Sequence, residues 1–149
     1  MRISERLQTV SRLFLDTAPI IYYVEASPRY LSHVESVFDL LDSGRLLAVA
    51  SPITLAECLV APYRLSRTDL QQAFSDLLSH NSNLLFAPID QPAAHVAAQL
   101  RARHNLTLTD AFQVAVALDN GCDAFLTNDA TLKRINDLAV LVLDEYEPG

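Results

Sequence analysis

Residues 12–16 read Arg-Leu-Phe-Leu-Asp, a short apolar run that ends at an acidic residue. Similar runs recur along the chain, and together they predict strands at residues 12–15, 46–50, 83–87, 124–127 and 139–143. The runs are continuous rather than alternating in polarity, which is typical of strands covered on both faces. Longer stretches with helical periodicity separate them. The sequence therefore predicts a three-layer α/β/α fold, with a parallel sheet of about five strands flanked by helices.

Helix ends are marked by residues that favour them. Ser51 followed by Pro52 predicts a helix start, because serine caps free N–H groups and proline fits the first helical position. Ser66 stands three residues before Asp69, the spacing of a capping box, and predicts another helix start. Gly121 predicts a helix end.

The composition is that of one folded domain over residues 1–149. Hydrophobic residues make up 50% of the chain and charged residues 19%, which excludes a disordered protein. The longest apolar run, residues 138–143, is too short to cross a membrane, and charged residues interrupt the N-terminal stretch. A cytoplasmic protein without a membrane segment is therefore expected. Cys58 and Cys122 lack CxxC spacing and are expected to be buried free thiols.

Three acidic residues stand where the predicted strands end or a helix begins. Asp16 ends the first strand, Asp129 follows the fourth, and Asp110 opens a predicted helix. Ligands of open parallel sheets bind beyond the carboxyl ends of the strands, so these carboxylates are candidates for a site. Each also has a structural alternative. Asp16 and Asp129 suit helix caps, and Asp110 has capping-box spacing from Thr107.

Glu57 lies in a helical pattern whose positions three and four residues away are mostly apolar. No Lys or Arg occurs between Arg45 and Arg64 to pair with it. We therefore expect a buried carboxylate, which must be paired, protonated or bound to a metal because an isolated buried charge is costly. Asp110 heads a similar apolar stripe. Carboxylates gathered in this way predict a shared cation, and oxygen ligands favour Mg²⁺ or Mn²⁺ over Zn²⁺.

Four short segments carry a resemblance to a known family: Phe14-Leu15-Asp16-Thr17, Ser51-Pro52-Ile53-Thr54-Leu55-Ala56-Glu57, Leu108-Thr109-Asp110-Ala111-Phe112 and Leu126-Thr127-Asn128-Asp129. With these segments in this order over residues 14–129, the chain resembles the PIN domain family, and specifically the VapC-type ribonuclease toxins of bacterial and archaeal toxin–antitoxin pairs. The resemblance implies a metal-dependent endoribonuclease that hydrolyses RNA phosphodiester bonds.

The resemblance also assigns roles to individual residues. It implies that the acidic residues Asp16, Glu57, Asp110 and Asp129 are catalytic and hold one or two Mg²⁺ or Mn²⁺ ions. Thr127 and Asn128 match residues that position the last acid or a metal-bound water. The implied partners are an RNA substrate, a second copy of the chain in a homodimer, and an antitoxin protein that fills the active-site groove.

The net charge of −7 is unusual for a protein that binds RNA, because phosphate contacts need basic residues. The candidates for RNA contact are those next to the acidic segments: Arg101, Arg103, Lys133 and Arg134. Each of them also suits an ordinary exposed helix face.

Three functions remain open from the sequence. The first is the ribonuclease, and the second is a catalytically inactive PIN-like module that only binds a protein partner. Binding of Mn²⁺ discriminates between these two. The third is another acid-rimmed α/β enzyme, such as a phosphatase or a phospho-acceptor receiver domain. No Asp-x-Asp-x-Thr segment follows the first strand and no lysine follows the last, which argues against the third.

Overall fold

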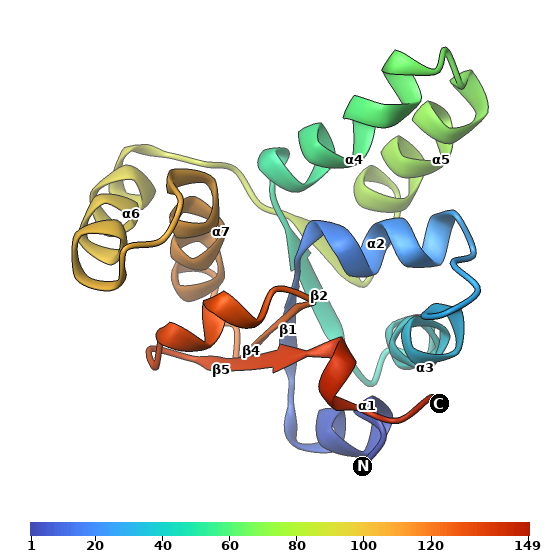
Figure 1. The fold of residues 1–149 in the computed structure, drawn as a ribbon, viewed down its shortest axis with the longest axis horizontal. Helices are drawn as coiled ribbons and strands as arrows, with labels where there is room; N and C mark the ends of the chain where they lie inside the picture. The colour runs from blue at the N-terminus through green and yellow to red at the C-terminus, as the bar shows by residue number, and fades with distance from the viewer.

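The computed structural model describes residues 1–149 and centres on a five-stranded parallel sheet of strand order β3-β2-β1-β4-β5 (Figure 1). The strands are Arg12–Leu15 (β1), Leu47–Ala50 (β2), Leu84–Phe86 (β3), Ala124–Thr127 (β4) and Ala139–Val142 (β5). Each predicted strand is present, and three of them are shorter by one residue at one or both ends. The predicted parallel sheet flanked by helices is confirmed.

The chain also has seven α-helices and three 3₁₀ turns; α2 to α7 and η2 connect the strands, α1 and η1 precede β1, and η3 follows β5. The α-helices are Ile3–Arg6 (α1), Thr17–Val24 (α2), Leu31–Asp42 (α3), Pro52–Arg64 (α4), Thr68–Ser79 (α5), Gln91–His104 (α6) and Leu108–Asp119 (α7). The 3₁₀ turns are Leu7–Thr9 (η1), Ala130–Arg134 (η2) and Leu143–Glu145 (η3). No helix is both long and apolar enough to span a membrane.

The sheet separates two hydrophobic cores, and the central strand β1 contributes to both. Leu13 and Leu15 pack into the core under α1, α2, α3 and α5, whereas Phe14 packs into the core under α6 and α7. The Phe14 ring stacks on that of Phe125 in β4, with ring centroids 4.9 Å apart. Burial on both faces explains why the strands are continuous apolar runs.

Helix α4 begins where the sequence predicts. Ser51 Oγ accepts hydrogen bonds from the N–H groups of Ile53 (3.1 Å) and Thr54, and the Thr54 hydroxyl accepts one from the Ser51 N–H (3.1 Å). This is a complete capping box, followed by Pro52 in the first turn. The predicted end of α7 is also present, because Gly121 adopts the left-handed φ of 67° that glycine tolerates.

The prediction that Ser66 caps the next helix is wrong. Helix α5 begins at Thr68, and its N-cap residue Arg67 makes no side-chain capping bond. The Asp69 carboxylate is bound instead by the Arg67 guanidinium, with N–O distances of 2.9 and 2.8 Å. That local ion pair replaces the capping box and lowers the pKa of Asp69 to about 2.

The two cysteines are free and buried, as predicted. Burial raises the pKa of both thiols to about 12, so neither is a thiolate at neutral pH.

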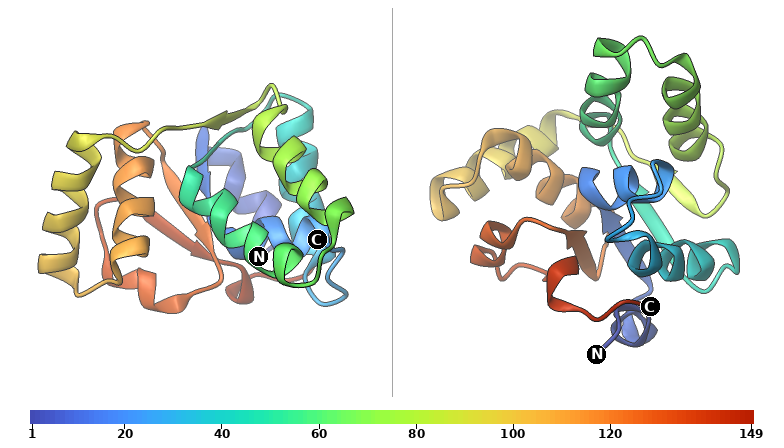
Figure 2. Two further views of the ribbon diagram at one scale, coloured as in Figure 1. Left: turned by 90° about the horizontal axis from the view of Figure 1, so that it is seen from above. Right: turned by 45° about the vertical axis from the view of Figure 1, so that its right-hand side comes forward.

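The helices frame one edge of the sheet. Helices α4 and α5 form a hairpin that stands out from the sheet, and α6 and α7 form a second pair on the other side (Figures 1 and 2). The carboxyl ends of β1 and β2 point between these pairs (Figure 1). The two chain termini meet at the opposite end, where the Glu147 N–H donates to the Met1 carbonyl oxygen (3.0 Å).

Candidate active site

The four predicted acidic residues come from separate elements. Asp16 lies between β1 and α2, Glu57 in α4, Asp110 in the first turn of α7, and Asp129 between β4 and η2. The Asp16 N–H donates to the Leu126 carbonyl oxygen (3.0 Å), so the carboxyl ends of β1 and β4 are side by side. The charges of Asp110 and Glu57 both act on the Asp16 carboxyl, and that of Asp129 acts on Asp110. The fold thus brings these residues to one edge of the sheet.

Asp16 has the most perturbed carboxyl group of the four. Burial raises its pKa from 3.8 to about 6, and the charges of Asp110 and Glu57 add to this shift. The Thr127 hydroxyl, which donates to Asp16 Oδ2 (2.8 Å), and the Thr17 backbone N–H act in the opposite direction. Asp16 occupies the N-cap position of α2 without a side-chain capping bond, so helix capping does not explain this residue.

Asp110 is half-buried at the start of α7. The helix begins two residues earlier than predicted, at Leu108, because Thr107 is its N-cap. The Thr107 hydroxyl accepts a hydrogen bond from the Asp110 N–H (3.2 Å), which is one half of the predicted capping box; the other half is absent, because the Asp110 carboxylate does not bond to the Thr107 N–H. Burial nevertheless raises the pKa of the Asp110 carboxyl, and the charge of Asp129 adds to this, while the Thr107 hydroxyl lowers it.

The prediction that Glu57 faces the apolar core is wrong. Its side chain is exposed, and the buried face of α4 is made by Thr54, Cys58 and Pro62. Helix α4 belongs to a hairpin that stands out from the sheet, so apolar residues such as Val60 (47% exposed) face solvent. A hydrogen bond from the Thr17 hydroxyl to Glu57 Oε1 (2.8 Å) holds the carboxylate at the start of α2, next to Asp16.

Asp129 is exposed and is the N-cap of η2. Its Oδ1 atom accepts hydrogen bonds from the Thr131 N–H (3.0 Å) and the Thr131 hydroxyl (2.7 Å). The capping alternative is therefore right for one carboxylate oxygen, whereas Oδ2 makes no hydrogen bond within the chain.

Thr127 and Asn128 contact different parts of the structure. Thr127 is fully buried, and its hydroxyl donates to Asp16 and accepts from the Asp129 N–H (3.0 Å), so it links these two acids. The Asn128 amide donates to the Tyr22 hydroxyl (3.1 Å) and accepts from the Asp144 N–H (3.0 Å). Asn128 therefore ties the Asp129 loop to α2 and η3.

Substitution of Tyr22 by Phe is expected to destabilise the fold by about 1 kcal/mol, because the Asn128 amide loses its acceptor. Tyr23→Phe is the matched control. The Tyr23 ring stacks on Phe38, but its hydroxyl makes no hydrogen bond, so no such loss is expected. Urea denaturation of both variants measures the difference. Equal stability of the two would show that the Tyr22–Asn128 bond does not hold the loop.

The donor set fits a hard divalent cation in its chemistry. All four candidate ligands are carboxylates, and the ion pairs of the chain use other acidic residues. A partly buried carboxyl such as Asp16, with two further acids acting on it and no basic partner, is in an environment that a cation stabilises. As the side chains stand, no three Asp, Glu, His or Cys residues form a ready metal-binding group.

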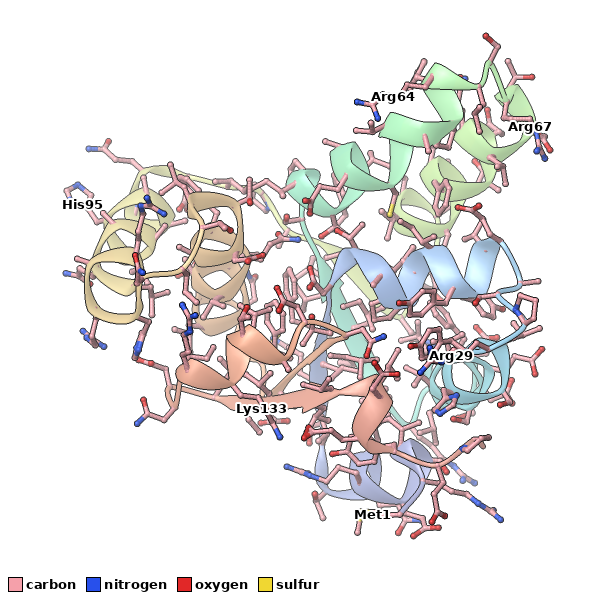
Figure 3. All side chains as sticks on the ribbon, viewed as in Figure 1. Met1, Arg29, Arg64, Arg67, His95 and Lys133 are labelled. Atoms are coloured by element: carbon pink, nitrogen blue, oxygen red, sulfur yellow. The ribbon has the colours of Figure 1, made fainter.

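The four basic residues predicted to contact RNA are all exposed, and each also bonds within the chain. Arg101 and Arg134 donate to backbone carbonyls in the loop before α7, and Arg103 and Lys133 form ion pairs (Figure 3 labels Lys133). Arg101 donates to the Leu106 carbonyl and Arg134 to the Asn105 carbonyl. Arg103 pairs with Asp137, and Lys133 pairs with Glu145. Each of these four side chains therefore has a partner within the chain, and their contact with RNA stays a prediction.

Arg64 is a basic residue that the sequence reasoning missed. It is exposed on α4 and makes no hydrogen bond or ion pair within the chain. In Figure 3 its side chain extends from the side of α4 that faces α6 and α7. The signal was its position seven residues after Glu57, which places both on nearly the same face of one helix.

With this geometry in view, the profile of the PIN domain family matches residues 13–138. The chain therefore belongs to the PIN domain family. Comparison with curated protein sequences gives no match.

Solved structures with the same fold include several toxin–antitoxin proteins. VapBC2 from Rickettsia felis, bound to a DNA fragment from its promoter, is 18% identical over 88% of this chain and 98% of that one, with a TM-score of 0.70. VapC20 of Mycobacterium tuberculosis, a sarcin-ricin loop cleaving toxin, is 16% identical over 76% and 86%, with a TM-score of 0.62. A toxin–antitoxin complex from Klebsiella pneumoniae is 23% identical over 89% and 98%, with a TM-score of 0.63.

Proposed function

We propose that this protein is a metal-dependent endoribonuclease that acts as the toxin of a toxin–antitoxin pair. The observation that carries the proposal is the environment of Asp16. Its carboxyl is partly buried at the carboxyl edge of the sheet, without a basic partner, and is influenced by the charges of Glu57 and Asp110. Membership of the PIN domain family and the sarcin-ricin loop cleaving toxin among the structural neighbours support the same activity.

The proposed ligands of Mg²⁺ or Mn²⁺ are Asp16, Glu57, Asp110 and Asp129. A bound divalent ion supplies a Lewis acid and a water of lowered pKa for phosphodiester hydrolysis. The threonines of the site orient these ligands: Thr17 holds Glu57, and Thr127 joins Asp16 to the Asp129 loop. The second oxygen of Asp129 is free to bind because capping uses only Oδ1.

The proposed partners are RNA, an antitoxin and a second copy of the chain, in the cytoplasm. Arg64 is the basic side chain best placed to contact an RNA phosphate, because it lies on the same helix as Glu57 and makes no bond within the chain. The structural neighbours from R. felis and K. pneumoniae are toxin–antitoxin assemblies, which supports a protein partner.

An inactive PIN-like interaction module is the second candidate. The observation that favours it is the absence of a ready group of three metal-binding side chains. Calorimetric titration of the protein with Mn²⁺ discriminates the two functions, since the interaction module is expected to bind no Mn²⁺ at millimolar concentrations.

Removal of divalent ions is expected to abolish RNA cleavage. The protein is purified alone and after co-expression with the product of the neighbouring gene. Cleavage of a structured RNA is then followed in Mg²⁺, Mn²⁺ or EDTA. Cleavage in Mg²⁺ or Mn²⁺ and none in EDTA is the expected result. The Asp16→Asn variant, purified in the same way, controls for contaminating nucleases. Equal cleavage in EDTA would overturn the metal-dependent mechanism.

A further inference from the structure

A buried polar bridge connects the two helices that carry Glu57 and Asp110. Its members are Ser51 and Thr54 at the start of α4 and Gln113 in α7, which are 0%, 0% and 1% exposed. The Ser51 hydroxyl donates to Gln113 Oε1, and Gln113 Nε2 donates to Thr54 Oγ1 (2.8 Å). The Gln113 side chain of α7 thus contacts both residues of the α4 capping box, Ser51 and Thr54.

Each side of this bridge lies one helical turn from an acidic residue of the site. Thr54 precedes Glu57 by three residues in α4, and Gln113 follows Asp110 by three residues in α7. At a rise of about 1.5 Å per residue, each bridging group is roughly 4.5 Å along its helix from the acid. Because a helix moves as a rigid element over one turn, a change in the bridge displaces the acids.

The apolar packing of the two helices does not link them in the same way. Cys58 of α4 belongs to the core on one face of the sheet, whereas Val114 of α7 belongs to the core on the other face. A buried network in which every polar side-chain atom has a hydrogen-bond partner favours one arrangement, since a shift of the helices leaves polar groups unpaired away from water. The bridge therefore selects one separation of α4 and α7.

We propose that Gln113 is a positioning residue that fixes the separation of Glu57 and Asp110 on the two sides of Asp16, and so sets the affinity of the site for a divalent ion. This inference rests on the proposed metal-dependent function. Gln113 itself contacts neither the ion nor the RNA. It acts through Ser51 and Thr54 on the placement of α4.

The test compares three variants by Mn²⁺ calorimetry. Gln113→Met keeps the size of the side chain but removes both hydrogen bonds, and it is expected to weaken Mn²⁺ binding roughly tenfold, as removal of groups that orient metal ligands does. Gln113→Glu is expected to retain the affinity within about twofold, because a buried carboxyl stays protonated, donates to Thr54 and accepts from Ser51. Val116→Ala, equally buried in α7, controls for loss of stability.

A double-mutant cycle separates positioning from general damage to the fold. If Gln113 acts by placing Glu57, then Gln113→Met is expected to cost little further Mn²⁺ affinity in a Glu57→Gln background. Fully additive losses, or a Gln113→Met variant that binds Mn²⁺ as tightly as Val116→Ala, would overturn the proposal.

A measurement without metal keeps this inference distinct from the proposed function. Nitroxide labels at the exposed positions Ala61 of α4 and Leu108 of α7 report the separation of the helices by electron paramagnetic resonance. Gln113→Met is expected to shift or broaden the distance distribution, and Val116→Ala is not. Altered distances with no Mn²⁺ binding by the wild type would refute the metal site, whereas unaltered distances would refute the bridge.

Discussion

The Asp16→Asn variant is expected to lose RNA cleavage and to gain stability at the same time. Burial raises the pKa of the Asp16 carboxyl to about 6, so its charged form is disfavoured in the folded protein. The shift from 3.8 corresponds to about 3 kcal/mol at a pH above 7, where the carboxyl is ionised in the folded and unfolded states. A neutral amide of the same shape avoids this cost but is a poor metal ligand.

The effect depends on pH with a defined sign. Because the folded-state pKa lies above the unfolded value, the carboxyl adds stability below about pH 4, and this contribution is lost as the pH rises through about 6. Urea denaturation from pH 4 to 8 is expected to show this loss in the wild type and not in Asp16→Asn. Asp39→Asn, an exposed substitution in α3, is the control.

The effect of added Mg²⁺ on stability tests whether Asp16 is a metal ligand. An ion that binds only the folded protein stabilises it in proportion to its affinity, so Mg²⁺ is expected to raise the stability of the wild type and leave Asp16→Asn unchanged. An Asp16→Asn variant that still cleaves RNA, or that Mg²⁺ stabilises as much as it does the wild type, would exclude Asp16 as the central ligand.

Asp110→Asn is expected to reduce kcat/KM for RNA cleavage by at least about a hundredfold. Even groups that only orient metal ligands cost roughly 10–100-fold, and Asp110 is proposed as a ligand itself. The fold is expected to remain intact because the Thr107 cap bonds to the Asp110 backbone N–H, which the substitution keeps.

Asp119→Asn is the matched control, because it removes the same charge from the exposed far end of α7. Single-turnover cleavage of one RNA by both variants gives the comparison. Equal rates for Asp110→Asn and Asp119→Asn would remove Asp110 from the active site.

The sheet was predictable from the sequence because burial on both faces leaves a local signature. A run such as Leu13-Phe14-Leu15 is apolar at every position since its side chains alternate between two cores. The edge carrying Asp16 and Asp129 followed from the same argument, because parallel strands end at a common edge.

The exposure of Glu57 was not predictable, because helical periodicity identifies neighbours but not the direction that a face points. Apolar residues around Glu57 indicated burial, yet in the α4–α5 hairpin two of them, Val60 and Ala61, face solvent together with Glu57. The predicted helix cap at Ser66 was wrong for a different reason. The Asp69 carboxylate, which the capping box needs, is bound by Arg67 instead.

The polar contacts that organise the site join residues far apart in the chain. Gln113 bonds to Thr54, and Asn128 bonds to Tyr22, across 59 and 106 positions respectively. Local sequence patterns do not predict which distant residues form such pairs. The one local sign was Gln113 itself, a polar residue within the otherwise apolar run of α7.

The meeting of the two chain ends has a practical consequence for protein engineering. The Met1 carbonyl bonds to the Glu147 N–H, and the residues that follow Met1 lead into the amino end of β1, across the sheet from the acidic rim. An affinity handle or a fluorescent fusion at either end thus stays clear of the proposed active site. A short linker between the ends would yield a circular permutant, in which new termini opened in an exposed loop leave the ligand-bearing edge untouched.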